Sequence, residues 1–185
     1  NSTPKSRLIL RSSRYFENQK TRNLFRKRFA AYGVDSTQLE FQGFRATRQQ
    51  HLRDIGDADI ALDPFPCNGG TTTCEVFWMG LPLVSMVTDS SMGRQGANYL
   101  KKLGLSDLGC KSPRDYVETA KRLADDPDRL LHLRTSLRPA VERKMLNYDQ
   151  HVQELEKSYE TMWRRHLDGA PHTAFSVQDD QVFED

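Results

Sequence analysis

The chain has few cysteines and no long apolar run, and each absence excludes a class of protein. Its 185 residues include only 3 cysteines, widely spaced, which argues against a disulfide framework and favours a reducing, cytoplasmic compartment. The sequence contains no Cys-x-x-Cys pair and no cluster of His and Cys that would indicate zinc. No segment approaches the roughly 20 apolar residues of a membrane-spanning helix, and no secretory signal is present. We therefore expect no membrane partner.

Net charge is also small, because 27 Lys and Arg nearly balance 25 Asp and Glu. Residues 1–53 hold 12 Lys and Arg against 3 Asp and Glu, whereas residues 168–185 hold 5 acids and no base. The bases are interspersed with a helical apolar pattern, which favours a solvated face or attraction for an anionic nucleotide over nucleic-acid binding. Residues 1–167 suffice for one domain, and the aperiodic segment 168–185 is expected to be a disordered acidic tail.

Short apolar strands and helical periods alternate through the first two thirds of the chain. The expected strands are Leu8–Leu10, Leu39–Gly43, Asp59–Asp63 and Pro82–Val87, and the expected helices are 17–33, Thr47–Asp57, Thr73–Met79 and one that ends at Gly104. After Ser112 the pattern is only helical, with helices expected to begin at Pro113, at Pro127 and near Tyr148. This order predicts an α/β fold: a Rossmann-like parallel sheet with helices on both faces, followed by C-terminal helices.

The loop after the third expected strand is suited to hold an anion. A Pro- and Gly-rich stretch ends in Gly70 and delivers Thr71, Thr72 and Thr73 to a helix start, where backbone N–H groups lack intrahelical partners and the helix dipole is positive. Glu75 lies on the same helical face as Thr71 and Thr72, one turn further on. If the threonine hydroxyls bound phosphates and the Glu75 carboxylate bound the two hydroxyls of a ribose, this segment would form a nucleotide diphosphate site. The alternative is an ordinary βα loop that binds nothing, since neither a Walker loop nor Gly-x-Gly-x-x-Gly is present.

The residue order of this segment resembles a known family. Asp59-Ile-Ala-Leu-Asp-Pro-Phe-Pro66, Gly69-Gly-Thr-Thr-Thr-Cys-Glu75 and Trp78-Met-Gly-Leu-Pro-Leu-Val-Ser-Met86 are similar to the catalytic half of the SPINDLY and O-linked N-acetylglucosamine transferase family. The resemblance runs from Ser6 to about Arg165. It implies the C-terminal domain of a GT-B glycosyltransferase, with an N-terminal GT-B domain and tetratricopeptide repeats upstream. The chain also begins at Asn1 without an initiator Met, so we expect a fragment. Comparison of the expected elements with the family implies that the first βα unit of the domain, before the strand at Leu8, is missing.

The resemblance implies a role for individual residues. Thr71 and Thr72 match the threonines that bind the donor's diphosphate, with Gly70 and Thr73 beside them. The nucleoside-binding positions are then Ala46, Arg48, His51 and Glu75, with Arg94 as a further possible contact. His51 is placed to stack on the base and Glu75 to bind the ribose hydroxyls. From the residues alone, a helix-surface histidine is the favoured interpretation of His51, and the alternative for Arg94 is a surface charge.

Two departures from the family pattern leave the donor open. Gly70 replaces a histidine of the N-acetylglucosamine transferases, and Arg48 replaces a lysine. The donor is therefore expected to be a UDP- or GDP-linked sugar, with N-acetylglucosamine or fucose transferred to Ser or Thr of an acceptor protein. The resemblance implies that transfer is inverting. We also expect it to be independent of metal, because no carboxylate pair stands beside the threonines. The catalytic groups themselves are expected upstream of Asn1.

Two other functions compete with this one. A non-catalytic nucleotide-sugar-binding or scaffold module would keep the same fold, and the upstream sequence would separate it from an enzyme. A Rossmann-like methyltransferase is disfavoured, because no Gly-rich loop follows the first expected strand.

Overall fold

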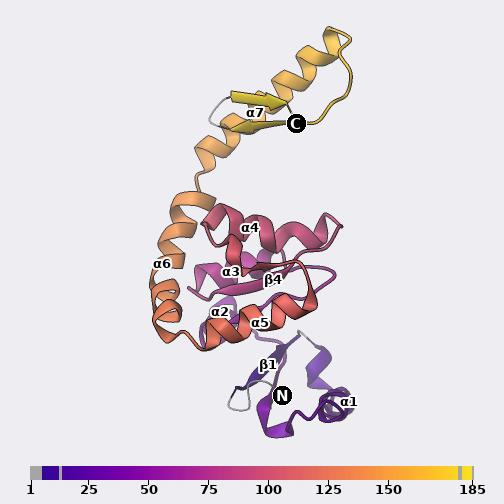
Figure 1. The fold of residues 1–185 in the computed structure, drawn as a ribbon, viewed down its shortest axis with the longest axis vertical. Helices are drawn as coiled ribbons and strands as arrows, with labels where there is room; N and C mark the ends of the chain where they lie inside the picture. The colour runs from indigo at the N-terminus through magenta and orange to yellow at the C-terminus, as the bar shows by residue number, and fades with distance from the viewer. Residues whose placement is uncertain (1–5, 13, 179–180, 185) are drawn as a thin grey trace. The chain divides into compact units, whose positions relative to one another are not determined.

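The structure, a computed structural model, describes residues 6–12, 14–178 and 181–184 (Figure 1). It consists of two compact units, one that ends at Val141 and one that begins at Glu142. Within the described residues, no helix combines the length and the apolar character needed to cross a membrane.

The first unit begins with two parallel strands joined through a helix. Strand β1 (Leu8–Arg11) pairs with β2 (Leu39–Gln42), with Leu8 opposite Leu39. Helix α1 (Gln19–Ala30) begins after Asn18, whose side chain accepts a hydrogen bond from the N–H of Lys20. Edge-to-face and tilted ring contacts among Phe16, Phe25 and Phe41 pack the connection on the strands.

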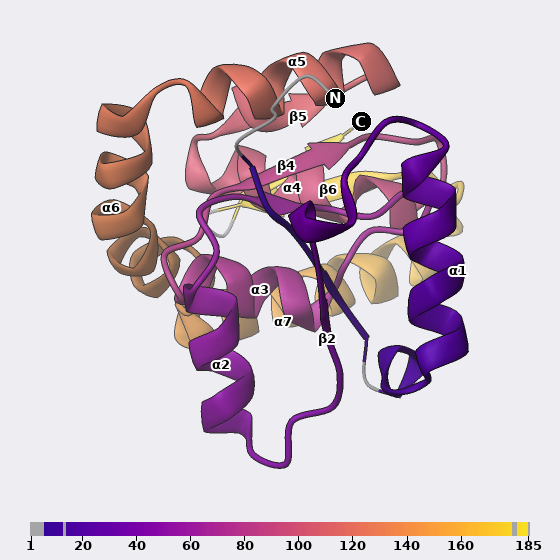
Figure 2. The same ribbon diagram turned by 90° about the horizontal axis from the view of Figure 1, so that it is seen from below.

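A second parallel group carries most of the buried core. Strands β3 (Ala61–Leu62), β4 (Leu83–Met86) and β5 (Gly109–Cys110) lie in that order. Every residue of β4 is buried, and successive side chains point to opposite faces, so both faces of this strand are covered. The helices around it are α2 (Arg48–Gly56), α3 (Thr71–Trp78), α4 (Gln95–Leu103) and α5 (Pro113–Ala124). Figure 2 shows α3 and α5 on opposite sides of β4.

These observations confirm the predicted fold class. Three expected helix ends are confirmed: the Thr47 side chain caps α2, α5 begins at Pro113, and α4 ends at Gly104 with φ of 83°. The Ser112 side chain caps α5, which was not predicted. Strand β5 was not anticipated, because two residues are too few to produce a hydrophobic pattern.

The sheet is interrupted. Over the residues that the structure describes, β1 pairs only with β2, and β3 pairs only with β4. In a doubly wound sheet a central strand would lie between two such groups. The missing strand stays a prediction, and the interruption is the feature that motivates it.

Helix α6 (Pro127–Met145) buries Leu133, Leu137 and Val141, and one of its arginines also binds the end of α2. The guanidinium of Arg134 donates hydrogen bonds to the carbonyls of Gly56 and Ala58, at the C-terminal end of α2. The carbonyl of the same arginine approaches Gly80 so closely that a Cβ there would lie 2.5 Å from it. Gly80 therefore permits both a turn and a close helix approach.

Replacing Gly80 by alanine should destabilise the protein by at least about 1 kcal/mol more than replacing Gly33. Both glycines have φ of 74°, but a Cβ at Gly33 would meet nothing within 4 Å. The two substitutions therefore cause the same backbone strain. The difference between their effects on the free energy of unfolding reports the collision with Arg134. Urea unfolding of the two variants measures it, and equal losses would show that α6 is not packed as described.

The second unit contains helix α7 (Tyr148–Leu167) and an antiparallel pair, β6 (Phe175–Gln178) with β7 (Gln181–Glu184). This pair corrects the expected disordered tail for the described part of 168–185. Apolar and polar residues alternate along Phe175–Gln178, which is the period-2 pattern of a strand within a segment of acidic composition. The guanidinium of Arg165 also lies 4.5 Å from the ring centre of Phe175, which ties the pair to α7.

Candidate functional site

The start of α3 lies where the C-terminal ends of parallel strands β3 and β4 meet, the edge at which open α/β sheets bind ligands. Thr71 and Thr72 are exposed. Among the described residues, the N–H groups of Thr71 and Thr72 have no hydrogen-bond partner, whereas the next two N–H groups both reach the carbonyl of Gly70. Gly70 is the N-cap and provides no side chain to cover the helix end. Two N–H groups and two hydroxyls are therefore available to an anion.

Thr73 has a different role from the one predicted. Its side chain is buried, and its hydroxyl donates a hydrogen bond of 2.9 Å to the carbonyl of Gly69. It holds the loop and does not line the exposed helix start, which corrects its place among the phosphate ligands. The sequence shows three equal hydroxyls, because position along a short helix start decides which of them turns inward.

The structure brings together three of the predicted nucleoside-binding residues. Nε2 of His51 on α2 lies 3.1 Å from a carboxylate oxygen of Glu75 on α3, and the guanidinium of Arg48 lies 3.5 Å from the other oxygen. The Glu75 side chain is 15% exposed, whereas that of Arg48 is 76% exposed. Since Glu75 shares a helical face with Thr71 and Thr72, this cluster continues the open helix start across to α2.

Arg11, which the sequence did not single out, supports this cluster from β1. Its guanidinium donates to the backbone carbonyl of His51 at 3.2 Å and to the Gln42 amide oxygen. It also lies 3.8 Å from the carboxylate of Asp54. Burial lowers the pKa of Arg11, and Asp54 opposes that effect. The β1–β2 pair is thereby tied to the helix that carries Arg48 and His51.

The two remaining predicted residues do not join the cluster in the described contacts. Ala46 is exposed in the segment before α2. Arg94 ends the short helix Met92–Arg94, and its guanidinium donates to the carbonyl of Asp89 in its own loop.

A buried carboxylate lies beneath the loop that leads to α3. Asp63 is 1% exposed, and it accepts hydrogen bonds from the N–H of Gly69 at 2.9 Å and from the hydroxyl of Ser85 at 2.7 Å. Burial raises the pKa of Asp63, while these two hydrogen bonds act in the opposite direction. The Tyr116 hydroxyl donates to the carbonyl of Asp63 at 2.9 Å. The only signal in the sequence was an acidic residue at the end of an apolar strand.

Carboxylates with Asp-x-Asp spacing occur away from the helix start. Asp57 and Asp59 stand before β3, and Asp126 and Asp128 stand between α5 and α6. Asp57 and Asp59 therefore lie at the opposite end of β3 from Thr71. In the part of the chain that the structure describes, no three His, Cys, Asp or Glu side chains are grouped to hold a metal ion.

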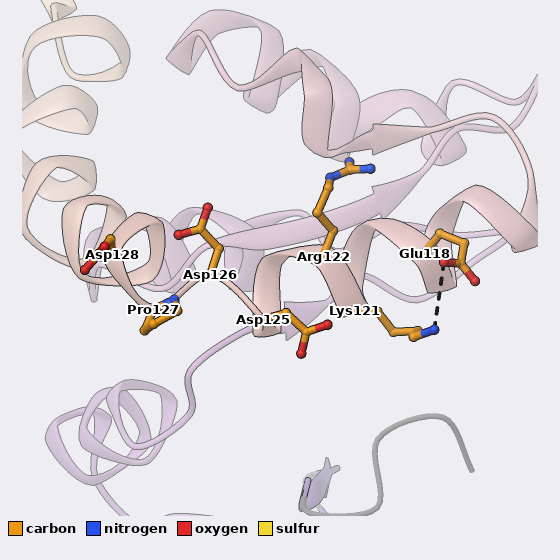
Figure 3. Close-up of a pocket in the computed structure, with 7 residues that line it drawn as sticks. All are labelled: Glu118, Lys121, Arg122, Asp125, Asp126, Pro127 and Asp128. Carbon is orange, nitrogen blue, oxygen red and sulfur yellow. Dashed lines mark ion pairs between the residues drawn. The ribbon is translucent and has the colours of Figure 1, made fainter.

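A hollow in the first unit lies at a different place from the start of α3. It is lined by Glu118, Lys121, Arg122 and residues 125–128, at the C-terminal end of α5 and the beginning of α6 (Figure 3). Glu118 and Lys121 form an ion pair there at 3.9 Å. Helix α5 begins after β5, so its far end lies away from the edge that carries Thr71. We do not place the nucleotide in this hollow.

Comparison with known proteins finds similarity over most of the chain. The profile described as "Glycosyl transferase family 41" matches residues 3–155. A probable UDP-N-acetylglucosamine–peptide N-acetylglucosaminyltransferase SPINDLY from Petunia hybrida is 34% identical over 169 residues, which cover 91% of this chain and 18% of that protein. A UDP-N-acetylglucosamine–peptide N-acetylglucosaminyltransferase from Caenorhabditis elegans is 31% identical over 147 residues, covering 79% of this chain and 13% of that protein.

A solved structure agrees with the fold. An O-GlcNAc transferase mutant from Thermobaculum terrenum superposes with a TM-score of 0.84 and 29% identity, over 92% of this chain and 32% of that one. The chain spans about a fifth of the length of the curated SPINDLY relatives that it matches.

Proposed function

We propose that this chain, which belongs to glycosyl transferase family 41, forms the donor-binding part of a protein O-glycosyltransferase. The longer enzyme would transfer a sugar from a nucleotide sugar to Ser or Thr of an acceptor protein, with inversion at the sugar. The observation that carries the proposal is the open start of α3, where Thr71 and Thr72 adjoin the cluster of Arg48, His51 and Glu75.

The proposed roles follow from the chemistry of each group. The free N–H groups and hydroxyls of Thr71 and Thr72 would bind the diphosphate, and Glu75 would accept hydrogen bonds from the ribose hydroxyls. His51 and Arg48 border Glu75 on the side where the base would extend. In the reaction the departing diphosphate gains negative charge, and a fixed helix start stabilises that charge without reorganisation. The acceptor and the remaining catalytic groups would come from other parts of the enzyme.

Two observations bear on the identity of the donor. The names of the relatives specify UDP-N-acetylglucosamine, which favours UDP. Gly70 stands where the N-acetylglucosamine transferases have a histidine, so a phosphate-side donor is absent and a GDP-linked fucose is the alternative. We also propose a cytoplasmic location, since Cys67, Cys74 and Cys110 are all free thiols.

We expect nucleotide binding without a divalent metal. The helix start supplies the charge stabilisation, and the Asp-x-Asp pair nearest in sequence lies at the other end of β3. Titrating the full-length protein with UDP and with GDP, each with and without EDTA, tests both the metal and the base. Affinity unchanged by EDTA is the expected result, and strict dependence on Mg²⁺ or Mn²⁺ would contradict it. Tight binding without transfer to any acceptor would favour a non-catalytic module.

A further inference from the structure

We propose that Asp63 is a positioning residue that holds the diphosphate-binding loop in the conformation that presents Thr71 and Thr72. The inference rests on the proposed donor site and adds a residue that touches neither donor nor acceptor. Asp63 follows β3, and the exposed helix start begins eight residues later. What links the two is the hydrogen bond from the Gly69 N–H to the Asp63 carboxylate.

The carboxylate joins segments that are separate in the sequence. One oxygen accepts from Gly69 in the loop, and the other accepts from Ser85 on β4. The loop's position is thus set relative to the most buried strand of the unit. Asn68 adds a second link, since its amide donates to the carbonyls of Pro64 at 3.0 Å and Met86 at 3.4 Å.

The first turn of α4 closes over the same carboxylate. A Cβ at Gly96 would lie 2.2 Å from both Oδ2 of Asp63 and Oγ of Ser85, so only glycine permits this approach. The N–H of Gly96 donates to the Asn68 side-chain oxygen at 3.4 Å. The first turn of α4, at the positive end of the helix, therefore lies close to the buried carboxylate. Asp63, Asn68 and Ser85 are all at least 94% buried, so these three side chains do not contact a nucleotide directly.

Asparagine and alanine at position 63 separate positioning from general stability. Asparagine retains both hydrogen bonds, because its oxygen accepts from Gly69 and its amide donates to the Ser85 hydroxyl. Alanine removes both and frees the N–H of Gly69. A carboxylate that positions the loop before α3 affects mainly the diphosphate, which is proposed to bind at Thr71 and Thr72 directly after that loop. It affects the nucleoside less, because the nucleoside is proposed to bind one turn further along α3, at Glu75, and against α2.

The experiment compares UDP with uridine, or GDP with guanosine if the wild type prefers it, as ligands of the full-length protein. Asp63→Ala is expected to weaken binding of the nucleoside diphosphate by about tenfold or more, and binding of the nucleoside by less than about twofold. Asp63→Asn is expected to restore diphosphate affinity to within about threefold of the wild type. The exposed Asp59, at the other end of β3, provides the matched control, and Asp59→Ala should change neither affinity.

Equal losses for the two ligands, an unchanged diphosphate affinity, or an asparagine variant as weak as alanine would overturn the proposal. If Asp63→Ala does not fold, Ser85→Ala removes one of the two hydrogen bonds and is expected to weaken only the diphosphate, by about threefold. A wild type that binds neither UDP nor GDP refutes the donor site itself. A wild type that binds, with Asp63 variants that do not discriminate, refutes only the role of Asp63.

Discussion

Thr72→Val in the full-length protein is expected to weaken nucleoside diphosphate binding by about 1–3 kcal/mol, the usual effect of losing a hydrogen bond to a charged group. The Thr72 hydroxyl is exposed at the start of α3, next to N–H groups that have no partner in the described structure. Valine keeps the β-branched shape and the backbone, so the loss reports on the hydroxyl. Isothermal titration with UDP or GDP measures it directly.

A matched control comes from another exposed threonine on a helix. The hydroxyl of Thr135 on α6 donates to the carbonyls of Leu131 and His132. Thr135→Val should therefore leave nucleotide affinity unchanged. If Thr72→Val has no more effect than Thr135→Val, Thr72 does not belong to the site.

The 185 residues expressed alone are expected to transfer no sugar. They span about a fifth of the SPINDLY relatives, and the proposed site binds only the donor. The same piece should also be marginally stable or self-associate, because β1 and β3 each pair on one side only in the described structure, and exposed strand edges invite association.

Helix α7 is a second reason to expect low stability or self-association of the 185 residues. Its apolar stripe is 42% to 61% exposed and comprises Val152, Leu155, Tyr159, Met162 and Trp163. Exposed apolar area costs about 25 cal/mol per Å² relative to burial, so a few hundred Å² would remove much of a total stability of roughly 5–15 kcal/mol. We propose that another part of the full-length enzyme covers the stripe and that a further βα unit completes the sheet.

Calorimetry and sedimentation of this piece, beside a version extended by such a βα unit, test the expectation. Extension should raise the melting temperature and reduce self-association. A monomeric 185-residue protein with a sharp, high melting transition, or with transferase activity, would show that the domain boundary is misplaced.

The sequence predicted most of the local structure, because capping and turn chemistry act over a few residues. Thr47, Pro113 and Gly104 marked helix ends within a residue or two, whereas α3 begins two residues before the expected helix Thr73–Met79. The family resemblance is confirmed by the match over residues 3–155. Short elements were not predicted. Strand β5 has only two residues, and it is defined by its pairing with β4, so its own sequence shows no strand pattern.

The contacts of the candidate site were only partly predictable. Residue spacing placed Thr71, Thr72 and Glu75 on one face, but it does not show that His51 meets Glu75, because that contact joins two helices. The inward turn of Thr73 and the burial of Asp63 both depend on tertiary packing around β4. An acidic residue that is 1% exposed is indistinguishable, in sequence, from an acidic residue in a solvated loop.

The most direct test of the donor site is a crystal structure of the full-length protein with bound UDP or GDP. The diphosphate oxygens are predicted to lie within hydrogen-bond distance of the N–H groups of Thr71 and Thr72, with the ribose hydroxyls at Glu75. A nucleotide bound elsewhere, such as in the hollow between α5 and α6, or one that leaves the start of α3 empty, would contradict the proposed site.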